Sequence, residues 1–87
     1  MAEKKVTLSI NKVDFPFKVT SDDFNRYVNE LQMDDKVSPA KRFLRRALVN
    51  PEQKEALDEL CDRGFAIQLA GKLQTAFQGE VEIEVKE

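Results

Sequence analysis

The chain contains no histidine, and this absence removes the side chain that most often serves as a general base near neutral pH. Its serines, Ser9, Ser21 and Ser38, do not stand in the G-x-S-x-G pattern of a serine hydrolase. The 3 glycines are too widely spaced to form a phosphate-binding loop. We therefore expect no catalytic residue and no enzymatic activity.

Cysteine is nearly absent as well. Cys61 is the single cysteine, so the chain cannot form an internal disulfide, and there is no Cys/His set for zinc. The acidic pairs Asp22-Asp23 and Asp34-Asp35 lack the ligand spacing of a calcium loop. We expect no cofactor and no metal, and we interpret Cys61 as a buried packing residue rather than a reactive thiol.

Long hydrophobic runs are also missing. No apolar run approaches the roughly 20 residues that cross a bilayer. The first ten residues, MAEKKVTLSI, contain no apolar block followed by a small-residue cleavage site, so we expect no secretory signal. The 87 residues are 41% hydrophobic and 34% charged, which is typical of one folded domain over residues 1–87.

Two strands are predicted near the N-terminus. Apolar and polar residues alternate over 6–10 and again over 13–19, which is the period of half-buried strands. Asn11-Lys12 between them has the length of a two-residue hairpin loop. Pro16 has no N–H to donate, so the second strand is expected at a sheet edge.

A third strand is predicted over 81–85, where Val81, Ile83 and Val85 alternate with glutamates. Because the second strand is an edge, we expect the third to pair with the first. The glutamates then form an acidic row, which is either a solvated face or a charged face that limits aggregation or meets a basic partner.

Helical patterns occupy the middle of the chain. Ser21 or Thr20 caps a first helix, Ser38-Pro39 begins a second, and Asn50-Pro51 begins a third. On one straight helix, the apolar residues of 56–61 and of 65–77 would lie on nearly opposite faces. Gly64 is therefore predicted to separate a third helix from a fourth.

Together these patterns predict an α+β fold. An N-terminal β-hairpin, three to four short helices and a C-terminal strand form a three-stranded sheet with the helices on one face. The residues expected to be largely buried are Val6, Leu8, Phe15, Phe17, Phe24, Val28, Leu44, Leu57, Leu69, Leu73 and Ile83.

The second helix is basic on one side. Lys41, Arg42, Arg45 and Arg46 carry four positive charges within six positions of a chain whose net charge is −2. On a helical wheel these cations occupy one half and apolar residues the other. Three interpretations remain: a solvated helix face, a docking site for an acidic protein surface, or a nucleic-acid contact. The acidic remainder of the chain and the lack of an aromatic on the basic half disfavour nucleic acid.

Over nearly its whole length, the chain resembles the small tail assembly chaperones of tailed phages and prophages. The blocks that carry the resemblance are, in order, KKVTLSINKVDFPFKVT, DDFNRYVNELQMDDKVSPAKRFLRRAL, PEQKEAL, GFAIQLAGKL and EVEIEVK. The resemblance implies a protein of the host bacterial cytoplasm. It would bind the tape measure protein, around which tail tube subunits polymerise, or the tail tube subunits themselves, or both. It implies no catalytic residue, no cofactor and no membrane contact.

The sequence leaves two other functions open. One is a small nucleic-acid-binding phage regulator that uses the basic face of the second helix. The other is a minor structural protein of the tail. Self-association into a homo-oligomer is compatible with all three functions.

Overall fold

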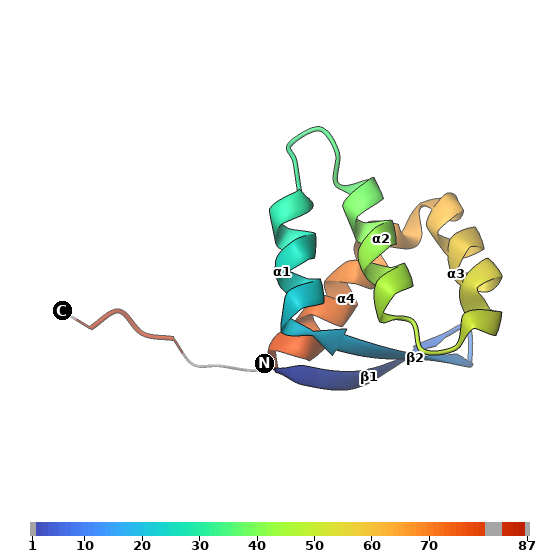
Figure 1. Ribbon diagram of the computed structural model, residues 1–87, viewed down its shortest axis with the longest axis horizontal. Coiled ribbons are helices and arrows are strands. Elements are labelled where there is room, and N and C mark those ends of the chain that lie inside the picture. Colours follow the sequence, from blue (N-terminus) through green and yellow to red (C-terminus); the bar gives the residue numbers. More distant parts are fainter. Residues whose placement is uncertain (1, 80–82, 87) are drawn as a thin grey trace.

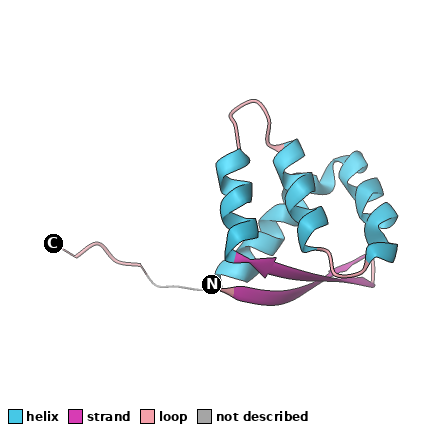
Figure 2. Cartoon of the chain, viewed as in Figure 1, coloured by secondary structure: helices cyan, strands magenta, loops and turns pink. Residues whose placement is uncertain are grey.

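The computed structural model describes residues 2–79 and 83–86 of the chain. A β-hairpin is followed by helices that all lie on one side of it (Figures 1 and 2). The regular elements are β1 (Glu3–Ile10), β2 (Val13–Thr20), α1 (Ser21–Glu30), α2 (Val37–Ala47), α3 (Lys54–Leu60) and α4 (Ala66–Gln78). Short helical turns, Pro51–Gln53 and Cys61–Phe65, precede and follow α3. The α+β fold with an N-terminal hairpin is confirmed.

The hairpin turn forms where the sequence predicts it. Asn11 and Lys12 both have positive φ, 53° and 66°, as a two-residue type I′ turn requires. The resulting register places Val6 opposite Phe17 and Leu8 opposite Phe15. The apolar side chains of both strands therefore face the helices, and the polar ones face away.

β2 tolerates Pro16 because a residue at this position directs its backbone N–H and C=O away from β1. Its carbonyl accepts a hydrogen bond from Val49 N–H at 3.1 Å, so the Pro16 backbone points away from β1. The missing N–H therefore costs the hairpin no hydrogen bond. The linker after α2 covers this edge of β2, with Leu48 bridged to Phe17.

The structure does not show the predicted third strand over residues 81–85. Residues 80–82 lie outside the described residues, and residues 83–86 form no strand. Ile83 is 85% exposed and Val85 is 89% exposed, so the predicted burial of Ile83 is wrong. Gly79, with a φ of 69°, turns the chain at the end of α4, and residues 83–86 stand away from the body (Figure 1). Alternation makes a segment able to form a strand, but a strand also needs a pairing partner.

A side-chain cap begins α1, and a side-chain hydrogen bond also lies at the start of α2. Thr20 Oγ1 accepts a hydrogen bond from Asp23 N–H at 3.1 Å, and this caps α1. Asp35 Oδ1 accepts from Ser38 N–H at 3.3 Å at the start of α2. The expected cap at Ser38 is wrong, because α2 begins at Val37 and its N-cap residue is Lys36, which makes no side-chain cap hydrogen bond. Pro51 begins the short turn that leads into α3.

Gly64 separates α3 from α4, as predicted. Its φ of 98° and ψ of 12° are not helical, and only glycine adopts such a φ readily. The break allows both apolar stripes to reach one core. Leu57 and Cys61 are buried on one side of it, and Ala66 and Leu69 on the other.

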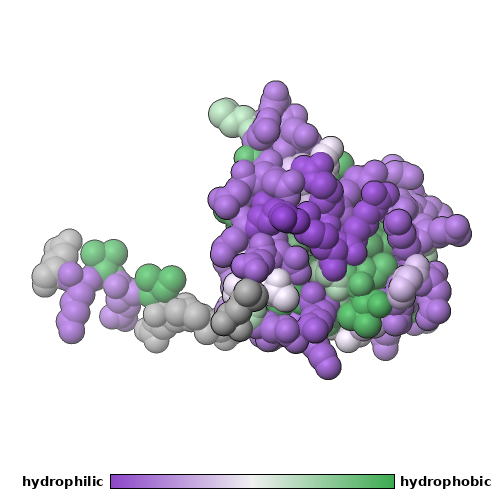
Figure 3. Space-filling model, in the orientation of Figure 1, coloured by the Kyte–Doolittle hydropathy of each residue, from purple (hydrophilic) through white to green (hydrophobic). Residues whose placement is uncertain are grey.

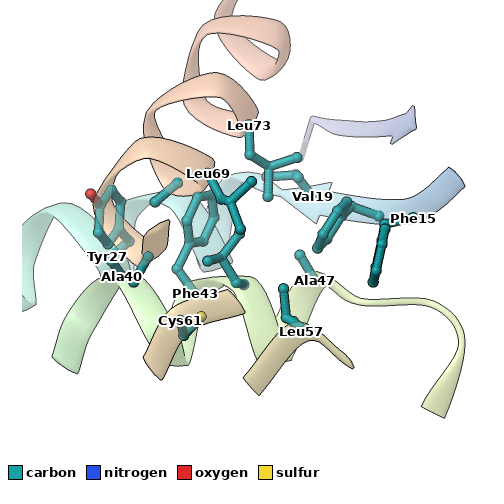
Figure 4. Close-up of a cluster of buried hydrophobic side chains, with 14 residues drawn as sticks. Phe15, Val19, Tyr27, Ala40, Phe43, Ala47, Leu57, Cys61, Leu69 and Leu73 are labelled. Carbon is teal, nitrogen blue, oxygen red and sulfur yellow. The ribbon is translucent and has the colours of Figure 1, made fainter. Parts of the chain in front are cut away.

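The core lies between the hairpin and the helices (Figure 4). Its buried hydrophobic residues are Phe15, Phe17, Val19, Tyr27, Ala40, Phe43, Leu44, Ala47, Leu57, Cys61, Ala66, Leu69, Ala70 and Leu73. Of the residues expected there, Val6, Leu8 and Phe24 are only partly buried and pack against this cluster. Tyr27 stacks on Phe43 with ring centroids 4.7 Å apart, which joins α1 to α2.

Val28 is a second error in the expected core, since it is 45% exposed. Tyr27, one position earlier, occupies the centre of the buried face of α1 against α2. Adjacent residues lie about 100° apart on a helix, so burial of Tyr27 turns Val28 toward solvent. The helical spacing of apolar residues in α1 is predicted correctly. The rotation of α1 about its own axis is set by the stack of Tyr27 on Phe43.

Replacement of Phe17 by alanine tests the assigned strand register. Phe17 is 1% exposed, so Phe17→Ala should lower the free energy of unfolding by about 3 to 5 kcal/mol. Val13→Ala, on the exposed part of the same strand, is the control and should change it by less than about 0.5 kcal/mol. Urea unfolding followed by circular dichroism measures both. Equal losses for the two variants would contradict the register.

Candidate functional site

The candidate site is the basic face of α2, which consists of Lys41, Arg42, Arg45 and Arg46. The apolar half of α2 contacts the core, where Phe43 and Leu44 are fully buried. This burial turns the basic half outward. Figure 1 shows α2 between α1 and α3, and Figure 3 shows strongly hydrophilic side chains across the centre of this face.

One row of the basic face is paired with the segment around α3. Lys41 Nζ lies 3.3 Å from Asp62 Oδ1. Arg45 Nε donates to Asp58 Oδ1 at 2.7 Å. Lys41 and Arg45 are four residues apart, as are Asp58 and Asp62, so the pairs form a short ladder between antiparallel segments.

The other row is paired with α1. Arg42 Nε donates to Glu30 Oε2 at 3.0 Å. Arg46 lies deeper, with Nη2 at 3.5 Å from Glu30 Oε1 and Nε at 3.8 Å from Asp23 Oδ1. These Arg46 nitrogens and Glu30 Oε1 are buried without a hydrogen bond among the described residues. Arg46 is therefore held by charge attraction and burial rather than by directed hydrogen bonds.

The basic face is thus part of a charge-paired surface. Four carboxylates from α1 and from the segment around α3 face its four cations. The sequence analysis found the cations but missed these partners. The available signal was the spacing of the acidic residues, since Asp58 and Asp62 repeat at the same interval as Lys41 and Arg45.

Asp58 and Arg45 shift each other's titration. The hydrogen bond from Arg45, together with its charge, holds the pKa of Asp58 below its ordinary value. The same hydrogen bond raises the pKa of Arg45. Both shifts favour the ionised pair, so Asp58 and Arg45 stay charged across the physiological range of pH.

Arg42 and Arg45 keep donors available to solvent. Their side chains are 47% and 43% exposed. Each uses its Nε in the hydrogen bond just described, and their terminal nitrogens make no hydrogen bond to the described residues. A guanidinium held in this way can still present its two NH₂ groups to another acceptor.

Three further features raised by the sequence concern Cys61, metal ligands and membrane-spanning helices. Cys61 is buried, and desolvation is the main cause that raises the pKa of its thiol. Over residues 2–79 and 83–86, no three His, Cys, Asp or Glu side chains come together in a group that could hold a metal ion. None of the described helices is long and apolar enough to cross a membrane.

Comparison with known proteins identifies similar sequences but no similar structure. Residues 6–87 match the family described as phage tail assembly chaperone. A relative from Haemophilus phage HP1 (strain HP1c1), named "Uncharacterized 11.3 kDa protein in lys 3'region", is 39% identical over 82 residues. The aligned part covers 93% of this chain and 79% of that protein. No solved structure matches the chain.

The Arg45–Asp58 pair predicts a pH dependence of stability. A carboxyl whose pKa is lowered by folding stabilises the fold above its unfolded pKa, and this contribution is lost as pH falls below about 4. Asp58→Asn should lower the free energy of unfolding at pH 7 by less than about 1 kcal/mol, since the pair is partly exposed. The difference from the wild type should shrink in acid. Urea unfolding at a series of pH values measures it, with Glu59→Gln as the control. A difference that stays constant into strong acid would contradict the assignment.

The burial of Cys61 predicts a slow thiol reaction. A thiol reagent should label the native protein much more slowly than the protein in denaturant, because burial blocks access and raises the thiol pKa. The measurement follows absorbance of the released chromophore over time. Equal rates under the two conditions would show that Cys61 is accessible.

Proposed function

The chain belongs to the phage tail assembly chaperone family, and from this premise we propose that it binds the tape measure protein, tail tube subunits, or both during tail assembly. The observation that carries this proposal is the family match over residues 6–87. The protein acts in the cytoplasm of the bacterial host, as one domain over residues 1–87. It keeps its partner available for polymerisation and catalyses no reaction.

The basic face of α2 is the proposed docking surface. Arg42 and Arg45 are held in place through Nε, so their terminal NH₂ groups point from a defined position rather than from a mobile side chain. A partner carboxylate can accept from these groups without breaking the internal pairs. Preorganisation of this kind lowers the entropy cost of binding.

The same pairing argues against a polyanion as the partner. Nucleic-acid affinity depends on uncompensated positive charge that releases counterions from phosphates. Here each cation of the basic face has a carboxylate within 4 Å. A local acidic group on a protein fits this surface better than an extended phosphate backbone.

A co-expression experiment tests the proposed function. The chain is produced in bacteria with the tape measure protein of the same phage, and the soluble tape measure protein that co-purifies with it is measured. We expect capture that depends on the chain. Absence of capture for both the tape measure protein and the tube subunit would contradict the function.

A pair of variants tests the docking surface separately. Arg42→Gln combined with Arg45→Gln should weaken capture at least about tenfold, because two charge-assisted sites are removed. Arg26→Gln combined with Lys18→Gln removes the same charge elsewhere and should leave capture unchanged. Thermal melts check that all variants fold. Full capture by the first pair would leave the chaperone function intact and would exclude this surface.

Tight and steeply salt-dependent binding of the wild type to random duplex DNA would instead indicate that the protein is a nucleic-acid-binding phage regulator. The titration is run at two salt concentrations with the same preparation of protein.

A further inference from the structure

A hollow with a positive lining lies between the end of α2 and the start of α3. It has a volume of about 320 Å³, and its lining residues are Arg45, Arg46, Leu48, Pro51 and Lys54. Every charged residue of this lining is a cation, and no carboxylate of the described residues lines it. Figure 1 shows the linker from α2 to α3 next to β2, and Figure 3 shows hydrophobic side chains beside strongly hydrophilic ones in this part of the surface. The hollow therefore joins positive charge to an apolar surface.

Lys54 adds a cation that the basic face of α2 does not include. It is exposed and makes no ion pair with the described residues. The hydrogen bond from Arg45 is the main cause that lowers the pKa of Asp58, and the charge of Lys54 lowers it further, so Lys54 lies near the Arg45–Asp58 pair. Two cations thus face one carboxylate, which leaves this part of the surface with a surplus of positive charge.

Arg45 and Arg46 also have hydrogen-bonding capacity that the described residues do not use. Arg45 donates to Asp58 through Nε alone, and its side chain is 43% exposed. Arg46 Nε and Nη2 are without a hydrogen bond among the described residues, and their carboxylate neighbours, Glu30 and Asp23, are 3.5 and 3.8 Å away. A carboxylate that enters the hollow would gain a charge-assisted hydrogen bond from Arg45 and the attraction of the Arg46 charge.

The apolar part of the hollow belongs to a linker that is fixed to β2. Val49 N–H donates to Pro16 O at 3.1 Å, and Gln53 Nε2 donates to Asp14 O at 2.9 Å. These two hydrogen bonds hold the linker near both of its ends. A surface that has its shape before binding loses less entropy when a partner docks on it.

We propose that this hollow binds one acidic side chain of a partner protein, with the carboxylate between Arg45 and Lys54 and an apolar neighbour of that side chain on Leu48 and Pro51. Charge complementarity selects the carboxylate, because the charged lining consists of cations only. The volume is near the lower end of the range for ligand pockets, which suits a side chain and its neighbour better than a run of phosphates. The identification of the partner as a phage tail protein rests on the proposed function.

A chemical-shift titration of the isotope-labelled full chain tests the hollow without a tail protein. The probe is the peptide acetyl-Leu-Glu-Leu-amide, and acetyl-Leu-Gln-Leu-amide is its matched control. We expect saturable shifts of the Leu48 and Lys54 amides and of Arg45 Nε–H with the Glu peptide, and at least about fivefold weaker binding of the Gln peptide. Inorganic phosphate should bind more weakly than the Glu peptide, because it makes no apolar contact.

Three results of this titration would overturn the proposal. They are the absence of shifts at these positions with the Glu peptide, equal binding of the two peptides, and tighter binding of phosphate than of the Glu peptide.

Lys54→Gln supplies a variant of the hollow itself. It should weaken binding of the Glu peptide at least about fivefold and leave the melting temperature unchanged, because Lys54 is exposed and makes no ion pair with the described residues. Lys72→Gln is the matched control. Lys72 also makes no ion pair with the described residues, and it lines a separate groove of about 390 Å³ beside the hairpin end of β1. Equal effects of the two variants would show that the overall charge of the chain attracts the peptide, and would overturn the proposal.

Zero-length cross-linking carries the test to the tail protein. A carbodiimide joins a lysine amine to a carboxylate that lies in contact with it. In the co-purified complex we expect Lys54 to be joined to an aspartate or glutamate of the tail protein, as identified by mass spectrometry of the digested product. Links from other lysines only, or from Lys54 only to another copy of this chain, would overturn the proposed use of the hollow and leave the chaperone function intact. If neither tail protein forms a complex, the proposed function fails, and the peptide titration alone then decides whether the hollow binds a carboxylate.

Discussion

Burial of the apolar half of α2 is the constraint on which the rest of this structure depends. Ala40, Phe43 and Leu44 are fully buried, and α2 contacts β2, α1, α3 and α4. A chain of this length has one small core, so loss of this helix would remove the element that contacts β2, α1, α3 and α4 together. The stacking of Tyr27 on Phe43 shows how closely α1 follows α2.

The ion pairs are a consequence of that burial. Once Phe43 and Leu44 face the core, the basic half has to emerge between α1 and α3, where it meets carboxylates on both sides. Individual exposed pairs stabilise a protein little, so we regard this surface as a device that orients guanidinium groups rather than as a main source of stability.

The break at Gly64 also shapes a second part of the surface. It allows α3 and α4 to bury different faces, and it leaves a groove beside β1 where the two meet. The protein therefore has two separate surfaces, one polar and charge-paired on α2, the other apolar with a positive rim at the sheet edge.

The sequence by itself determined the features that depend on neighbours along the chain. The hairpin turn at Asn11-Lys12, a cap at Ser21 or Thr20, the break at Gly64 and the apolar half of α2 follow from backbone preferences and from periodicity, which act over a few residues. The resemblance to tail assembly chaperones likewise needed only the order of sequence blocks, and the family match over residues 6–87 agrees with it.

The tertiary structure alone decided the features that depend on distant elements. The carboxylate partners of the basic face lie on α1 and around α3, and their identity depends on how helices pack. Val28 and Ile83 have the hydrophobicity of core residues, yet both are exposed. The stack of Tyr27 on Phe43 sets the rotation of α1, and no described strand pairs with residues 83–86. Periodicity shows which residues share a face, but only packing determines what that face meets.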